Sequence, residues 1–195
     1  VKSIIKKLSI ENFDITTDDI GYKIAPLINA VGRIGDPKLI IDLFTNESNE
    51  SVVKLTKDCF TMNKERKRLT SLVEQEALAI AVSEYRSDRK FLVLSKSEWH
   101  PGIIGIVAAR MVDMFNLPTA LLAEANDGNF RGSIRSNHKL KVNQALAECD
   151  DLLLAHGGHS SAAGFSIKKE NIPNLRERLN KIAYREFKNI NLYKT

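Results

Sequence analysis

The residues best suited to chemistry lie in one stretch, His156 to Ile167, with the sequence HGGHSSAAGFSI. Glycines let a ligand approach the backbone closely, and successive N–H groups can form a concave anion site. Histidine can donate a further hydrogen bond to an oxyanion. A glycine that ends a helix would explain one glycine but not the whole pattern. The stretch predicts a ligand-binding loop, carried to the surface by a buried apolar element over 152–155.

A second segment, 29–37, has the sequence NAVGRIGDP and holds an arginine between two glycines. The planar guanidinium of Arg33 can bind a phosphate through two parallel hydrogen bonds. An ion pair with Asp36 is the alternative, and composition does not separate the two. The glycines and the proline predict a loop here.

A third segment, 99–106, crosses from a predicted strand to a predicted buried helix. Gly102 would present free N–H groups at the positive end of that helix, which suits a phosphate. Gly105 is expected to permit close packing of the helix on the sheet. For His100 a structural role and a ligand role are equally open. Trp99 fits the core at least as well as it fits a base-stacking platform.

The fourth segment, 131–136, alternates as a strand does. Arg131, Ser133 and Arg135 are therefore expected on one strand face, with Ser136 at the end of the strand. Such a row can bind a phosphodiester through forked and hydroxyl hydrogen bonds. A solvated face of an edge strand is the alternative interpretation.

No complete catalytic apparatus is evident in the chain. The sequence GHSSA at 158–162 misses the last glycine of the Gly-x-Ser-x-Gly nucleophile motif, and His159 is the last histidine, so a serine hydrolase is improbable. The four histidines, at 100, 138, 156 and 159, lack the spacing of known metal motifs. The basic segments can hold a phosphate, but nothing obvious activates water.

Composition sets further limits. The 195 residues suffice for one core plus an appended piece, and the net charge of +5 permits a polyanionic partner. Two distant cysteines, Cys59 and Cys149, favour a reducing compartment, and no apolar run is long enough to span a bilayer. We therefore expect a cytoplasmic protein. Because the chain begins with Val1, we also expect a fragment of a longer one.

Helical patterns dominate the first half. Thr16 to Asp19 offer N-cap residues to a helix that starts late or kinks at Pro26, and a short amphipathic helix follows over 39–44. Residues 49–87 contain no Gly or Pro and predict one long helix, apolar at its ends and polar over 63–68. This pattern favours a bridge between two lobes, with 63–68 as a solvated basic face. A coiled-coil arm is the weaker alternative, because Arg66 and Glu76 would lie on its seam.

The second half predicts an α/β domain with a mixed β-sheet flanked by helices. Strands are expected over 91–94, 119–123, 130–135 and 163–167, with a turn at Asp127-Gly128. Helices are expected over 103–115 and 142–149, and an amphipathic helix closes the chain with Ile172, Leu175, Leu179, Ile182 and Phe187 on one face. A long bridging helix and a short helical N-terminal segment precede this domain.

Four ordered motifs resemble the RecJ family of single-strand-specific exonucleases. Residues 24–33, IAPLINAVGR, are similar to the end of the family's catalytic lobe. The motifs at 99–108, 132–136 and 157–165 are similar to successive motifs of its DHH-associated domain. The resemblance runs from about residue 18 to residue 185. It departs from the family at Leu27, where Arg is frequent, and at His156, where an aromatic usually precedes Gly-Gly-His.

The resemblance implies a two-lobed phosphoesterase whose first lobe carries an Asp-His-His motif and two divalent metals, Mn²⁺ or Mg²⁺. No Asp-His-His tripeptide occurs in this chain, so no metal is expected to be bound by it. The implied divisions are the end of the catalytic lobe over 1–48, the connecting helix over 49–87 and the DHH-associated substrate-binding domain over 88–195.

The resemblance also assigns roles. Arg33 would approach the scissile phosphate, and His159 would face the metals and hold the substrate. Contacts with single-stranded DNA are expected from Asn29, His100, Arg131, Ser133, Arg135, Ser136, Gly157 and Gly158. The expected function is substrate binding within a 5′-to-3′ exonuclease of recombination and repair, the chain alone being inactive. The alternatives are a domain of a short-oligonucleotide or cyclic-dinucleotide phosphodiesterase, and a non-catalytic RNA-binding domain like that of alanyl-tRNA synthetases.

Overall fold

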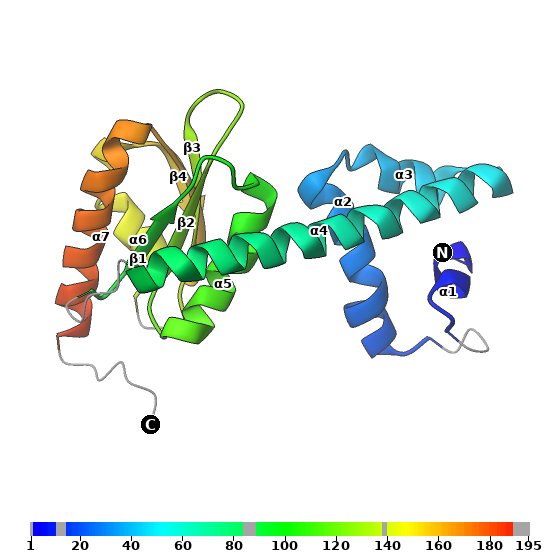
Figure 1. The fold of residues 1–195 in the computed structure, drawn as a ribbon, viewed down its shortest axis with the longest axis horizontal. Helices are drawn as coiled ribbons and strands as arrows, with labels where there is room; N and C mark the ends of the chain where they lie inside the picture. The colour runs from blue at the N-terminus through cyan, green and yellow to red at the C-terminus, as the bar shows by residue number, and fades with distance from the viewer. Residues whose placement is uncertain (1, 11–14, 84–88, 138–139, 189–195) are drawn as a thin grey trace. The chain divides into compact units, whose positions relative to one another are not determined.

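The computed structural model describes residues 2–10, 15–83, 89–137 and 140–188 (Figure 1). The chain forms two compact units, Val1–Leu69 and Thr70–Thr195. The helix α4, Asn49–Ser83, contributes its first half to one unit and its second half to the other. Its 35 residues correspond to about 52 Å at 1.5 Å per residue. The long helix is confirmed as far as Ser83, and the rest of its predicted extent, 84–87, lies outside the described residues.

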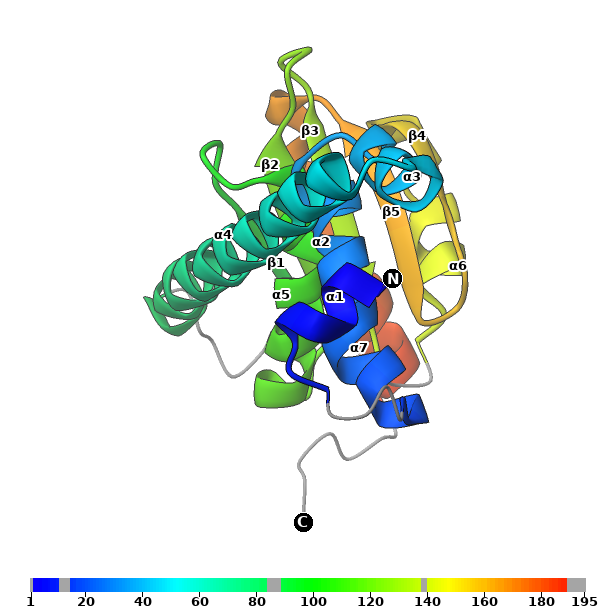
Figure 2. The ribbon, with the colours of Figure 1, turned by 90° about the vertical axis from the view of Figure 1, so that its right-hand side faces the viewer.

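The first unit is helical. Besides the first half of α4 it contains α1 (Lys2–Lys7), α2 (Ala25–Ile34) and α3 (Lys38–Thr45). Figure 2 shows α3 beside the start of α4 and α2 running crosswise to α4. The short helix α1 was not predicted, because its two buried residues, Ile4 and Ile5, are too few to establish a period. They pack with Leu27, Val31 and Cys59 in one hydrophobic cluster. This cluster, rather than local pattern, stabilises so short a helix.

The predicted N-cap is confirmed at Thr16. The Asp19 carboxylate accepts hydrogen bonds from the backbone N–H and the hydroxyl of Thr16, and the Asp19 N–H donates to Thr16 Oγ1 at 3.1 Å. The hydrogen bond from Lys23 contributes most, and the bonds from Thr16 contribute next, to lowering the pKa of the Asp19 carboxyl to about 2. A π-helical stretch, η2 (Asp19–Ile24), leads into α2 without a break in the helical backbone, and Pro26, which has no N–H to donate, lies in the first turn of α2.

The loop predicted over 29–37 is wrong for its first six residues. Asn29 to Ile34 continue α2, and only 35–37 connect it to α3. The apolar residues Leu27, Ala30 and Val31 follow helical spacing and are buried, so their packing overrides the weak helix propensity of Gly32.

The second unit contains a five-stranded mixed sheet in the order β1-β2-β3-β5-β4. Among the strands of the described residues, only the β1–β2 pair is parallel. The strands are β1 (Leu92–Ser95), β2 (Thr119–Glu124), β3 (Phe130–Arg135), β4 (Leu153–Gly158) and β5 (Ala162–Ile167). The predicted α/β class with a mixed sheet is confirmed. Gly128, with φ of 76°, forms the predicted turn between β2 and β3.

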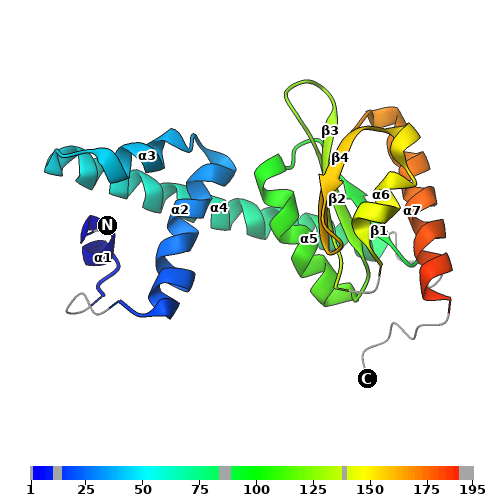
Figure 3. The ribbon, with the colours of Figure 1, turned by 180° about the vertical axis from the view of Figure 1, so that it is seen from behind.

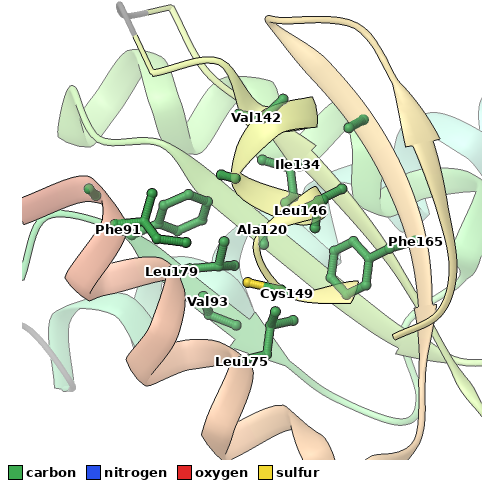
Figure 4. Packing of buried hydrophobic residues seen from close by; sticks show 14 of the residues in the cluster. Phe91, Val93, Ala120, Ile134, Val142, Leu146, Cys149, Phe165, Leu175 and Leu179 are labelled. Carbon is green, nitrogen blue, oxygen red and sulfur yellow. The ribbon is translucent and has the colours of Figure 1, made fainter. Parts of the chain in front are cut away.

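Helices cover both faces of this sheet (Figure 3). One face packs against α5 (Pro101–Phe115), and the other packs against α6 (Val142–Ala147) and α7 (Ile172–Phe187). Figure 4 shows the core beneath α6 and α7, where Ile134 and Phe165 meet Leu146 and Leu179. All five residues predicted for the buried face of the last helix are buried.

The segment 152–167 differs from its prediction. The run 152–155 was expected to be buried, but Leu154 is 50% exposed and Ala155 is exposed. The expected ligand loop is instead a β-hairpin of β4 and β5, with His156 to Gly158 inside the edge strand. An edge strand has a partner on one side only, which is why its apolar residues stay accessible. In the part of the chain that the structure describes, no helix is long and apolar enough to cross a membrane.

Candidate nucleic-acid interface

Strand register brings three segments of the second unit onto one face of the sheet. Ser133 on β3 lies opposite Gly164 on β5, and Gly164 lies opposite Gly157 on β4. In the next row Arg135 lies opposite Ala162. The His159 N–H donates to the Ala162 carbonyl at 2.8 Å, which continues the register and sets His159 in the same row. Arg135 and His159 are therefore two strand spacings apart, about 10 Å.

Where Gly157 on β4 pairs with Gly164 on β5, this sheet face carries no side chains. A Cβ added to Gly157 would meet nothing within 4 Å, and one added to Gly164 would meet only the Gly132 carbonyl, at 3.7 Å. Both glycines are exposed, whereas α5 packs over β2 and β3. A ligand can therefore lie directly on the backbone here, beside Ser133 and Arg135.

Gly158 holds the hairpin in shape. Its φ is +144°, and an added Cβ would lie 2.5 Å from Ala163 Cα. The two turn residues are also bound to neighbouring elements: Ser161 O accepts from the Ser136 N–H, and Ser160 O accepts from the Val142 N–H, each at 2.9 Å. The end of β3 and the start of α6 thus anchor the turn that carries His159.

Arg135 is held in a defined position. Its Nη1 donates to Ser133 Oγ and to the Ile134 carbonyl, both at 2.8 Å. Gly105 in the first turns of α5 lies directly over it, since a Cβ there would be 2.9 Å from Arg135 Nη2 and 3.0 Å from Ser133 Oγ. The predicted close packing at Gly105 is confirmed. Arg135 is half-buried, and these bonds hold its guanidinium beside Ser133.

The two remaining residues of this strand segment are placed differently. Arg131 shares the predicted face, but its guanidinium binds Asp127 Oδ2 at 2.9 Å and also Ser166 Oγ. Ser136 directly follows β3, as predicted, but is only 7% exposed. Because β3 is the central strand, the alternative of a solvated edge-strand face does not apply.

The loop before α5 is fixed by α4. Glu76 accepts hydrogen bonds from Trp99 Nε1 at 2.8 Å and Lys96 Nζ at 2.7 Å, and Trp99 is buried. His100 then caps α5, its Nδ1 accepting from the Gly102 N–H at 3.0 Å. His100 therefore has a structural role, and this bond leaves Nε2 as the nitrogen that carries the proton in the neutral ring.

Asn29 and Arg33 lie in the first unit. They are one helical turn apart on α2 and both are accessible, so they share one helix face. With Gly32 they line a groove whose other wall includes Ile40 and Ile41 of α3. The structure therefore divides the ten candidates into this pair and eight residues of the second unit.

His156 faces away from these rows, since it lies opposite Phe165, which is in the core on the other sheet face. Its Nε2 is 3.2 Å from Asp150 Oδ1. His138 lies outside the described residues. Within the described ranges, no three His, Cys, Asp or Glu residues gather closely enough to hold a metal ion. The described residues thus do not form a metal centre.

The sequence does not indicate two features of the site. The place of Gly164 beside Gly157 follows only from the hairpin register. The role of Glu76 as an anchor for Lys96 and Trp99 follows only from their tertiary contacts. A carboxylate beside the buried helix positions Val73 and Ala77 was the signal that could have indicated a polar anchor.

The chain is similar to proteins of known family. The family model described as the DHHA1 domain matches residues 88–185. The single-stranded-DNA-specific exonuclease RecJ of Bacillus subtilis (strain 168) is 35% identical over 184 residues, which cover 94% of this chain and 23% of that protein. The chain thus spans about a quarter of that relative's length.

Two solved structures are also similar. A crystal structure of exonuclease RecJ bound to manganese matches with a TM-score of 0.81 at 26% identity, over 97% of this chain and 47% of that one. RecJ from Thermus thermophilus in complex with Mg²⁺ matches with a TM-score of 0.77 at 29% identity, over 86% of this chain and 26% of that one.

Proposed function

Because this chain belongs to the DHHA1 domain family, we propose that its sheet-bearing unit holds the substrate of a single-stranded-DNA-specific exonuclease of recombination and repair. The observation that carries the proposal is the juxtaposition of Arg135 and His159 in one cross-strand row, beside the exposed backbone of Gly157. Two hydrogen-bonding side chains next to bare backbone suit a phosphodiester, which needs charged donors and close approach.

Each residue has a distinct task in this proposal. Arg135 presents a preordered fork to phosphate oxygens, and Ser133 adds a hydroxyl. His159 donates a hydrogen bond to a phosphate oxygen from the far end of the row. Gly157 lets the DNA strand lie on the exposed backbone of the sheet, and Gly158 acts indirectly by shaping the hairpin that carries His159. Three residues contribute less directly. The Ser136 N–H holds the hairpin turn, and Arg131 lies beside its partner Asp127. His100 would donate a hydrogen bond from its Nε2–H.

Catalysis would need parts that the described residues do not supply. Relatives have been solved with Mg²⁺ or Mn²⁺, and we propose that the whole enzyme uses such an ion, which activates water and stabilises the charge of the displaced oxygens. Asn29 and Arg33, one turn apart on α2, would contact the scissile phosphate. An enzyme of this kind acts on DNA, so we propose a cytoplasmic location.

The experiment measures binding of the purified chain to labelled oligothymidylate by fluorescence anisotropy across a salt series. We expect weak, salt-dependent binding. Arg135→Ala should reduce the magnitude of the slope of log K against log[salt] by about 0.7, because one phosphate contact is lost. His159→Ala should weaken binding without changing the fold. Lys181→Ala on α7, which covers the other sheet face, is the charge-matched control and should bind as the wild type does.

Three outcomes would count against the proposal. Unchanged affinity and salt slope in both site variants would refute the site assignment. Degradation of single-stranded DNA by the chain with added manganese would refute the claim that it is inactive alone. Tighter binding of dinucleotides than of longer strands, or of tRNA than of DNA, would favour the phosphodiesterase or the RNA-binding alternative.

A further inference from the structure

The first unit contains a second basic surface, apart from the candidate residues on α2. A groove runs between α1, the η2–α2 segment and the first half of α4, and we call it the basic groove. Six of its thirteen lining residues are cationic, and none of the thirteen is acidic. The cations are Lys7, Lys23, Lys57, Lys64, Arg66 and Lys67. The basic run of α4, expected from sequence to be a plain solvated face, thus forms one wall of a concave surface.

Most of this positive charge is not neutralised within the unit. Lys23 pairs with Asp19 Oδ1 at 2.6 Å, and Arg66 donates to Asn63 Oδ1. For the other four lysines of the groove, the described segments of the chain supply no carboxylate within ion-pair distance. Four like charges converging on one concavity repel one another, so a polyanion that enters gains from all four.

Aromatic side chains lie among these cations. Tyr22 on η2 lines the groove and is 81% exposed, and half-buried Phe60 lines it from α4. The Lys7 ammonium lies 4.8 Å from the centroid of the Phe60 ring, so this lysine is held at the rim. An exposed aromatic beside several lysines is the combination that binds single strands, because bases stack on rings while lysines neutralise phosphates.

The geometry along α4 suits an extended chain. Lys57 and Lys64 are seven residues apart, close to two helical turns, so they project from the same side of the helix about 10 Å apart. Lys67 follows within one further turn. A ligand with regularly repeated negative charges can contact them in succession, whereas a single small anion cannot.

We propose that the basic groove binds a segment of single-stranded nucleic acid, with its lysines on successive phosphates and a base stacked on Tyr22. The ligand class rests on the proposed function, but the residues are all separate from those of the sheet. The chain would then carry two contact surfaces for single-stranded nucleic acid, one in each compact unit.

The test compares two charge-matched double variants of the full chain. Lys7→Gln/Lys57→Gln removes two groove lysines. Lys6→Gln/Lys54→Gln removes two exposed lysines from the same two helices that do not line the groove. Affinity for labelled oligothymidylate is measured across a salt series. The groove variant should lose about tenfold in affinity, and the magnitude of its salt slope should fall by about 1.4, while the control variant keeps both.

Unchanged binding by the groove variant, or an equal loss in both variants, would overturn the proposal. A second pair, Lys64→Gln/Lys67→Gln, gives the same test without disturbing the Lys7–Phe60 contact, and a urea titration confirms that each variant folds. Tyr22→Ala should weaken binding of oligothymidylate but not of inorganic polyphosphate, which has no bases. Equal binding of the oligonucleotide by Tyr22→Ala would refute stacking.

The outcomes also separate the two surfaces. If Arg135→Ala weakens binding and the groove variants do not, the basic groove is refuted and the sheet site stands. If the groove variants weaken binding and Arg135→Ala does not, the groove is supported and the sheet assignment fails.

Discussion

The indole N–H of Trp99 donates to Glu76 Oε2 at 2.8 Å, and this bond joins the second half of α4 to the loop that begins α5. The same carboxylate accepts from Lys96, and the residue after Trp99, His100, caps α5. The start of α5 then presses Gly105 onto the Ser133–Arg135 side chains. A carboxylate outside the proposed site thus anchors the loop that leads into the helix packed over Arg135.

Removing this carboxylate should cost stability. Glu76→Gln leaves Lys96 without its partner and weakens the bond from buried Trp99, so we expect the unfolding free energy to fall by about 1–2 kcal/mol. Urea unfolding at neutral pH measures this loss of unfolding free energy. Glu177→Gln, an exposed change on α7, should cost far less. Equal values for the two variants would show that the anchor contributes nothing.

The anchor should also be sensitive to acid. The Lys96 ammonium, followed by the Trp99 indole, lowers the pKa of Glu76 below its ordinary value of 4.5. A carboxyl with a lowered pKa stabilises the fold above that ordinary value and loses this contribution as the pH falls through its folded pKa. The stability gap between the wild type and Glu76→Gln should therefore shrink below pH 4.5. A difference in unfolding free energy between the two proteins that stays constant below pH 4.5 would contradict the role of Glu76 as an anchor.

Two neighbouring glycines should respond differently to alanine. Gly158→Ala places a Cβ 2.5 Å from Ala163 Cα at a φ of +144°, so it should lower the unfolding free energy by more than about 2 kcal/mol. Gly157→Ala meets nothing within 4 Å and should leave stability nearly unchanged. Because its methyl group stands on the exposed backbone, it should still weaken oligothymidylate binding. Normal binding by a folded Gly157→Ala protein would remove that surface from the site.

Alanine at Gly105 should separate binding from stability. Helix propensity favours alanine over glycine by up to about 1 kcal/mol, so the unfolding free energy of Gly105→Ala should be close to that of the wild type. Its Cβ would lie 2.9 Å from Arg135 Nη2 and displace the guanidinium. We expect about fivefold weaker DNA binding, equivalent to one hydrogen bond of about 1 kcal/mol. Ala109 on the same helix can be changed to Ser as a control.

The two cysteines should be inert in the native protein. Both are buried, and desolvation raises the pKa of the Cys149 thiol from its ordinary value of 9.0 to about 11. A thiol with a raised pKa contributes its stabilisation fully below its ordinary pKa and loses it as the pH rises through the folded value. Between pH 9.0 and about 11, wild-type stability should fall more steeply than that of Cys149→Ala. Fast labelling by a thiol reagent in native buffer would contradict this burial.

Periodic segments could be predicted from the sequence because burial follows a helix or strand period directly. The five apolar positions of α7 and the alternation of β3 are confirmed in this way. Non-periodic segments could not. Gly32 and Gly35 suggested a loop, yet packing of Leu27 and Val31 extends α2 through Arg33. The three glycines of 156–167 suggested a loop, yet cross-strand hydrogen bonds make a hairpin.

The sequence by itself determined the mixed α/β class, the long helix and the residue types that can bind a phosphate, since these depend on local period and side-chain chemistry. Only the tertiary structure decided that Arg135 and His159 share one row across β3, β5 and β4, and that the lysines of three separate segments converge on the basic groove. The physical reason is the same in both cases. Strand register and helix packing join residues that are distant along the chain, and no local pattern specifies which partner each backbone or helix face will meet.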